Sequence, residues 1–103
     1  MQVIQKVRMR MDSLHTPATD RLFEAILRLS TVEDCYALFE DLCTIRELRD
    51  LSQRFEVAEM LADGRSYQEV SQKTGASTAT ICRVNKCLLY GCGGYRAALE
   101  EKK

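Results

Sequence analysis

Apolar residues recur along most of this chain at intervals of three and four, the spacing of amphipathic helices. The first such segment opens after Thr16, with Pro17 at the first helical position and Asp20 opposing the helix dipole. The second opens at Ser30 or Thr31. Their apolar positions are Leu22, Phe23, Ile26, Leu27 and Leu29, then Val32, Cys35, Tyr36, Phe39 and Leu42. Together the two segments carry more apolar surface than a small monomer easily covers, which predicts a subunit interface.

The longest predicted helix runs from Thr44 to about Ala62. Thr44 and Glu47 have the spacing of a capping box, and Gly64 suits the left-handed conformation that ends a helix. The apolar stripe is Ile45, Leu48, Leu51, Phe55, Ala58 and Leu61.

The stretch from Ser66 to Leu88 is predicted to form two short helices joined by a tight turn. Ser66 and Glu69 form another capping box, and Gly75 supplies the turn because a positive φ costs little without a Cβ. Ser77 or Thr78 caps the second helix. Val70 anchors the first helix, and the apolar stripe of the second is Ile81, Val84 and Leu88. This layout is typical of a helix–turn–helix, in which the second helix enters the major groove of DNA.

The glycine-rich stretch at 90–94 breaks the chain again, and a last short helix is predicted from Tyr95 to Glu101. Residues 1–15 form either a frayed helix or a mobile basic arm that can lie along DNA. No strand or repeat is evident. The expected architecture is therefore all-α with five or six helices, organised as an arm (1–15) and one helix–turn–helix domain (16–103).

Length and composition restrict the class of protein. The chain has 103 residues, 46% of them hydrophobic and 29% charged, which fits a single globular domain. No apolar run is long enough to cross a bilayer, and no signal peptide is evident, so a cytoplasmic protein without a membrane partner is expected. The five cysteines lack a CxxC pair, and His15 is the one histidine. A disulfide framework, a zinc site and a bound cofactor are therefore not expected, and a redox or metal sensor is a minor alternative.

The formal net charge is zero, but the charges are unevenly distributed. Residues 20–42 hold six acids against two bases. By contrast, Ser66 to Leu88 holds three bases and one acid, the sign that phosphates require. The bases are Lys73, Arg83 and Lys86, and the small hydroxylated residues at the start of the second helix are Ser77, Thr78 and Thr80. Small side chains at that position allow close approach to base edges.

Two segments of the sequence, DLCTIRELRDLSQRFEVAEML and TGASTATICRV, are long enough to be specific. With the sequence around them, Leu22 to Gly91, they resemble the Trp-repressor superfamily, and within it the YerC/YecD group of bacterial Trp-repressor-like proteins. The resemblance implies an all-helical, intertwined homodimer that regulates transcription by binding double-stranded operator DNA. Two heads related by a two-fold axis would read half-sites about one helical turn apart.

The resemblance also implies contact residues, position by position. The DNA contacts of the family match Gln68 and Ser71 on the first short helix, and Thr78, Ala79, Thr80, Cys82 and Arg83 on the second. Lys73 and Lys86 are added on charge alone, and Ser77 as the start of the reading helix.

A small-molecule effector site is implied as well, at positions matching Arg54, Arg83, Val84 and Cys87. Val84 stands where the repressor has glycine, and its extra carbons would crowd a flat ligand. Cys87 replaces a serine and is a poorer hydrogen-bond partner. We therefore expect an effector other than tryptophan, or none.

The alternative function is a helical protein-interaction module without specific DNA binding, in which the acidic segment between Asp20 and Asp41 would favour basic partners. Catalysis is not expected, because the sequence lacks a paired-carboxylate site, a phosphate-binding loop and a nucleophile near His15.

Overall fold

The computed structural model describes residues 14–100. In that part of the chain all regular secondary structure is helical, as predicted. The helices are α2 (Pro17–Leu27), α3 (Val32–Leu42), α4 (Ile45–Ala62), α5 (Tyr67–Thr74), α6 (Thr78–Tyr90) and α7 (Gly94–Leu99). The last helix starts one residue earlier and ends two residues sooner than predicted. The arm predicted at 1–15 lies almost entirely outside the described residues.

Serine and threonine side chains start the first five of these helices. In each case the hydroxyl accepts a hydrogen bond from the backbone N–H three residues later, which satisfies one otherwise unpaired donor. The capping residues are Thr16, Thr31, Thr44, Ser66 and Ser77. The boxes predicted for α4 and α5 are complete, because Glu47 and Glu69 also accept from the backbone of their caps, each at 2.9 Å.

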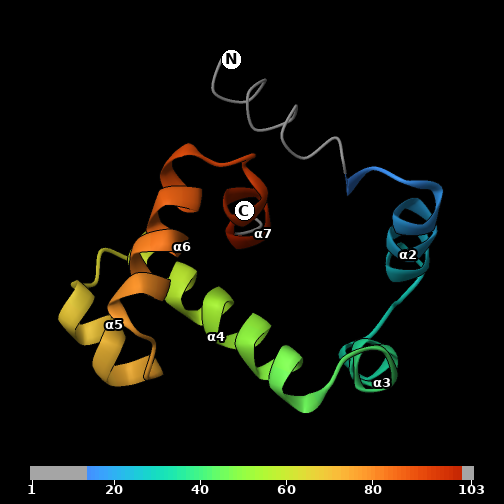
Figure 1. The fold of residues 1–103 in the computed structure, drawn as a ribbon, viewed down its shortest axis with the longest axis horizontal. Helices are drawn as coiled ribbons and strands as arrows, with labels where there is room; N and C mark the ends of the chain where they lie inside the picture. Colours follow the sequence, from blue (N-terminus) through green and yellow to red (C-terminus); the bar gives the residue numbers. More distant parts are fainter. Residues whose placement is uncertain (1–13, 101–103) are drawn as a thin grey trace.

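The hydrophobic core lies where the second half of α4 meets α5 and α6 (Figure 1). Its buried residues are Val57, Ala58, Val70, Ala76, Ile81 and Val84, with Leu88 almost as well covered. The apolar anchor predicted for α5, Val70, and the stripe predicted for α6 are therefore confirmed. On α4 only Ala58 of the predicted stripe is buried, and Val57, which the pattern missed, is fully buried beside it.

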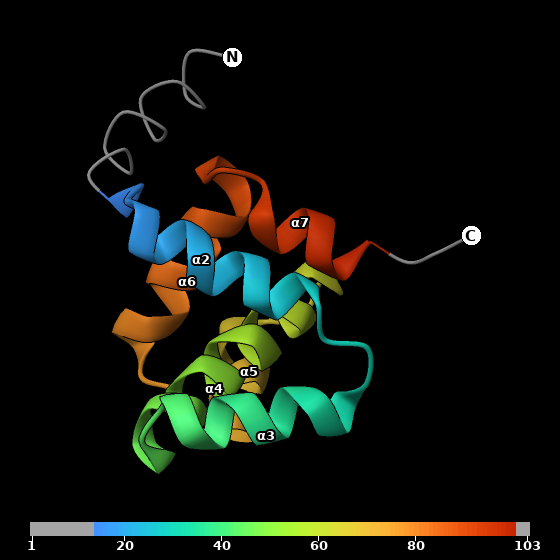
Figure 2. The same cartoon turned by 90° about the vertical axis from the view of Figure 1, so that its right-hand side faces the viewer.

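The first two helices leave most of their apolar surface uncovered. Figures 1 and 2 show α2 and α3 at the far end of α4 from α5. α3 packs on the start of α4, whereas α2 packs extensively against none of the other described helices. Leu27 is 82% exposed and Phe23 is 56% exposed. The radius of gyration is 15.1 Å, about 2 Å above the value expected for a compact chain of about 100 residues.

The short helix α7 returns to the body of the molecule and packs against both α4 and α6. Tyr95 and Leu99 lie against the core from this helix. None of the helices in residues 14–100 is long and apolar enough to cross a bilayer.

Candidate nucleic-acid interface

The turn between α5 and α6 is built by a left-handed glycine and two side-chain hydroxyls. Gly75 has a φ of +76°, a conformation that strains any residue with a Cβ. Thr74 Oγ1 accepts from the Ala76 N–H at 3.1 Å and donates to the Val70 carbonyl at 2.7 Å. Ser71 Oγ donates to the Ala76 carbonyl at 3.3 Å. These bonds fix the direction in which the chain enters α6.

One face of α6 is fastened to the core while the start of its other face is open. Ile81 and Val84 are each 1% exposed. Thr78 and Ala79 are exposed at the first turn, and Thr80 is partly covered. Ser77 accepts the Thr80 N–H and bonds to Thr80 Oγ1, both at 3.1 Å. The tip of the helix therefore carries small side chains in a fixed arrangement.

A side chain from the long helix supports this unit from behind. Gln53 Nε2 on α4 donates to the Thr74 carbonyl at the end of α5, at 3.1 Å. It is a long-range hydrogen bond between partly buried groups, and it satisfies a carbonyl that a helix end leaves unpaired. The sequence pattern did not single out Gln53 or Thr74, because a polar residue on a helix flank carries no periodic signal.

The structure places the remaining predicted contact residues on the exposed surface of α5 and α6. Gln68, Ser71 and Lys73 are exposed on α5, and Cys82, Arg83 and Lys86 are exposed on α6. Within residues 14–100, none of the three bases forms an ion pair; the ion pair there joins Arg65 to Asp63 at 3.4 Å. The cationic groups thus stay available to an anion. Ser71 and Ser77 are already engaged in the turn and the cap.

Glu69 is the acidic residue within this unit, and it serves the capping box. Its hydrogen bond from the Ser66 backbone N–H, assisted by the nearby Arg65 charge, lowers the pKa of Glu69 below its ordinary value. The carboxylate therefore stays charged at the start of α5, where it favours the helix dipole.

The four predicted effector residues do not share one environment. Val84 is buried in the core, whereas Arg83 and Cys87 are exposed. Arg54 is partly covered and lines an open hollow of about 650 Å³ together with Phe55 and Tyr95. Burial raises the pKa of the Tyr95 phenol, Cys87 raises it further and Arg54 opposes the shift. Tyr95 therefore borders Arg54 in the same hollow, a proximity that no spacing in the sequence signals.

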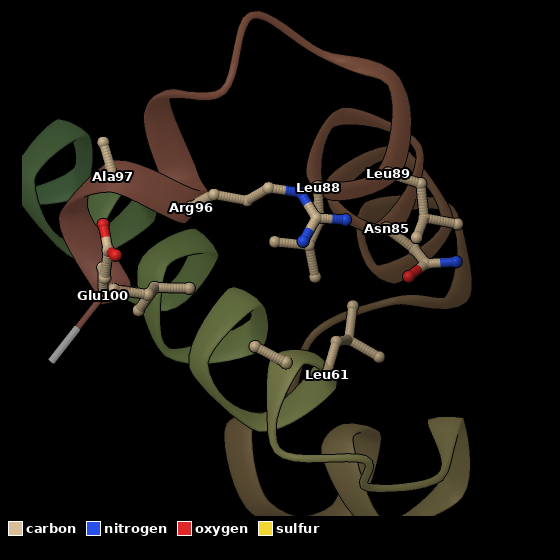
Figure 3. Close-up of a pocket in the computed structure, with 9 residues that line it drawn as sticks. Leu61, Asn85, Leu88, Leu89, Arg96, Ala97 and Glu100 are labelled. Atoms are coloured by element: carbon tan, nitrogen blue, oxygen red, sulfur yellow. The ribbon is translucent and has the colours of Figure 1, made fainter.

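A second open hollow, of about 750 Å³, lies between α4, α6 and α7 (Figure 3). Leu61, Leu88 and Leu89 provide apolar walls, and Arg96 extends across the space from α7.

No disulfide joins the cysteines of residues 14–100. That part of the chain also holds no group of three side chains suited to a metal ion.

Comparison with known proteins gives consistent matches. The family model described as Trp repressor protein matches residues 18–103. The uncharacterized protein YerC of Bacillus subtilis (strain 168) is 50% identical over 95 residues, covering 92% of this chain and 91% of that protein. A Trp repressor candidate from Staphylococcus aureus has a solved structure that aligns with a TM-score of 0.81 and 43% identity, over 89% of this chain and 97% of that one. A TrpR-like protein from Eubacterium eligens ATCC 27750 aligns with a TM-score of 0.80 and 51% identity, over 88% and 99%.

Proposed function

The chain belongs to the Trp repressor family, and from that premise we propose that it is a transcriptional regulator that binds operator DNA sequence-specifically as a homodimer. The proposal assigns no catalytic step to the protein. Its work would be done on chromosomal DNA, which in a bacterium lies in the cytoplasm.

The observation that carries the proposal is the asymmetry of α6. One face holds Ile81, Val84 and Leu88 in the core, which fixes the helix. The first turn presents Thr78 and Ala79 to solvent beside Thr80, and side chains of that size permit close approach to bases. A helix with a buried stripe and a small, exposed N-terminal tip is what reading the major groove requires.

The bases around the tip supply the electrostatic part of the binding. Lys73 and Lys86 have no carboxylate partner among residues 14–100, and Arg83 lies on the exposed side of α6. We assign these three to phosphates and Gln68 to a phosphate or an adenine edge. Phosphate contacts give orientation and salt dependence, whereas base contacts give sequence preference.

Dimerisation is supported by the apolar surface that one chain leaves uncovered. α2 has an apolar face that packs extensively against none of the other described helices. Ile45 at the start of α4 is 73% exposed, and the open hollow between α4, α6 and α7 in Figure 3 has leucine walls. Patches of this extent are unusual on a monomer. We propose that a second copy of the chain covers them, in an interface of the obligate, hydrophobic kind that buries about 2,000 Å² or more.

The test is selection of bound fragments from random duplex DNA, followed by affinity measurements across a range of salt concentrations. Wild-type protein is expected to enrich one sequence and to lose affinity steeply as salt rises. Thr80→Glu should abolish the preference while circular dichroism stays unchanged. A negative side chain at the tip would repel phosphates and would be too large for the site.

Arg83→Ala should weaken binding to all duplexes about equally and reduce the salt slope by about 1 per reading head. Arg21→Ala on α2 is the matched control, because it removes the same charge far from the tip. An effect confined to one base position would contradict a phosphate role for Arg83. Absence of any DNA binding at low salt would refute the proposed function and favour the protein-interaction module.

A further inference from the structure

Tyr95 lies at the meeting point of three helices. α7, which carries it, packs against both α4 and α6. Its ring contacts Phe55 of α4, with the ring centroids 6.4 Å apart and the planes inclined by 37°. The side chain is partly buried against the core that holds α6. Tilted aromatic contacts at this distance are attractive beyond the area they bury.

The groups around the phenol come from both of the other helices. Tyr95 shares its hollow with Arg54 and Phe55 of α4, and Cys87 of α6 raises the pKa of the phenol while Arg54 lowers it. Arg54 and Cys87 are two of the positions expected from the family resemblance to hold a small-molecule effector. Tyr95 borders the first of these positions, Arg54, in the same hollow.

The backbone between α6 and α7 limits where Tyr95 can go. At Gly91 a Cβ would collide with the Cys87 carbonyl, because the chain turns back closely on the last turn of α6. Gly93 has a φ of +89° and starts α7 in a left-handed conformation. A glycine that avoids a clash, Gly91, and a glycine that avoids backbone strain, Gly93, therefore set the position of α7 and, through it, the place of the Tyr95 ring.

We propose that Tyr95 is a positioning residue for α6: its ring, packed beside Phe55 of α4 and against the core that holds α6, keeps the reading helix in its DNA-binding orientation. The inference rests on the proposed function, since it concerns the orientation of the helix assigned to DNA. It implies that removing the ring makes binding dependent on an aromatic compound.

The test compares Tyr95→Ala and Tyr95→Phe in the full-length chain, using the best duplex selected with wild-type protein. Tyr95→Ala should lower the affinity of the folded protein roughly tenfold, within the usual range of coupling between sites. Tyr95→Phe keeps the ring and should stay close to wild type. p-Cresol, which matches the missing side chain, should restore the affinity of Tyr95→Ala by filling the cavity and should leave wild type unchanged.

Met60→Ala is the matched control for a merely structural effect. Met60 is also partly buried against the core, but it lines the hollow beside Arg65 and Glu69 on the α5 side. Unfolding curves give the folded fraction of each variant. Met60→Ala should lose stability and keep the operator affinity of its folded fraction. Equal affinity losses in the two alanine variants, or a Tyr95→Ala loss explained by its folded fraction alone, would overturn the inference.

A second variant and a hydrogen-exchange measurement also test whether Tyr95 positions α6. If Tyr95→Ala fails to fold, Tyr95→Leu, which keeps apolar bulk without the ring, is measured in its place and judged by the same comparison. Hydrogen exchange of the α6 amides should rise in the Tyr95 variant and not in Met60→Ala; equal exchange in the two variants would overturn the positioning role of Tyr95. If wild-type protein binds no DNA, the proposed function fails, whereas the exchange comparison still decides whether Tyr95 holds α6.

Discussion

Leu27 offers the sharpest test of the proposed homodimer. It lies at the end of α2, 82% exposed, on a helix that packs extensively against none of the other described helices. Leu27→Ala removes apolar surface that one chain does not bury, so it should leave the core around Val57 and Val84 intact. Any large effect must therefore come from contact with a second copy.

The size of the effect follows from the exposed fraction. Burying a whole leucine side chain contributes about 1.5–3 kcal/mol. If the partner covers the exposed four-fifths, each Leu27 contributes about 1–2.5 kcal/mol, and the two copies in a dimer about 2.5–5 kcal/mol. Since 1.4 kcal/mol corresponds to a factor of ten, the substitution should raise the dimer dissociation constant by roughly 60- to 4,000-fold.

Sedimentation equilibrium over a range of protein concentrations measures that constant directly. Tyr67→Ala on α5 is the control, because Tyr67 is also exposed and apolar but lies in the unit assigned to DNA. Its dissociation constant should match wild type. If wild-type protein sediments as a monomer at high concentration, or if Leu27→Ala dimerises as well as wild type, the reasoning from uncovered apolar surface is wrong.

Three smaller effects follow from the turn, the long-range bond and the cap. Gly75→Ala should destabilise the protein by about 1–2 kcal/mol in denaturant unfolding, because alanine must adopt the left-handed φ; unchanged stability would show that the turn relaxes. Gln53→Ala should cost about 1 kcal/mol in the same assay and raise hydrogen exchange at the end of α5. The pKa of Glu69 is lower in the folded state, so its contribution to stability is present above about pH 5 and is lost as the pH falls through that lowered pKa. Glu69→Gln should therefore lose less stability than wild type between pH 7 and pH 3, and parallel acid titrations would contradict the cap.

The helices could be predicted well from the sequence, because capping residues and glycines mark where most of them begin or end. Two capping boxes in the sequence predict where α4 and α5 begin: Thr44 with Glu47, and Ser66 with Glu69. Gly75 predicts the turn, because few other residues tolerate its positive φ. The buried stripe of α6 also follows from spacing alone. Such features depend on neighbours within four residues, which a sequence displays directly.

Features that depend on distant residues were harder to foresee. Val57 is buried although the predicted stripe of α4 passes beside it, because α5 and α6 together cover a wider arc than one partner would. Gln53 and Tyr95 act across many residues of sequence, on Thr74 and on Phe55. Nothing in their local pattern distinguishes a polar or aromatic flank residue that bridges two helices from one that faces water.

The long helix α4 packs against different helices at its two ends. Its last turns hold Val57 and Ala58 in the core beneath α6, while its first turn exposes Ile45 next to α3. Its 18 residues make a rigid rod of about 27 Å, so a tilt of about 5° at the α3 end displaces the other end by about 2 Å. That displacement is several times the spread of about 0.5 Å in protein N–H···O hydrogen-bond lengths. A small reorientation of the outer helices would therefore reach the core beneath α6 through a rigid α4.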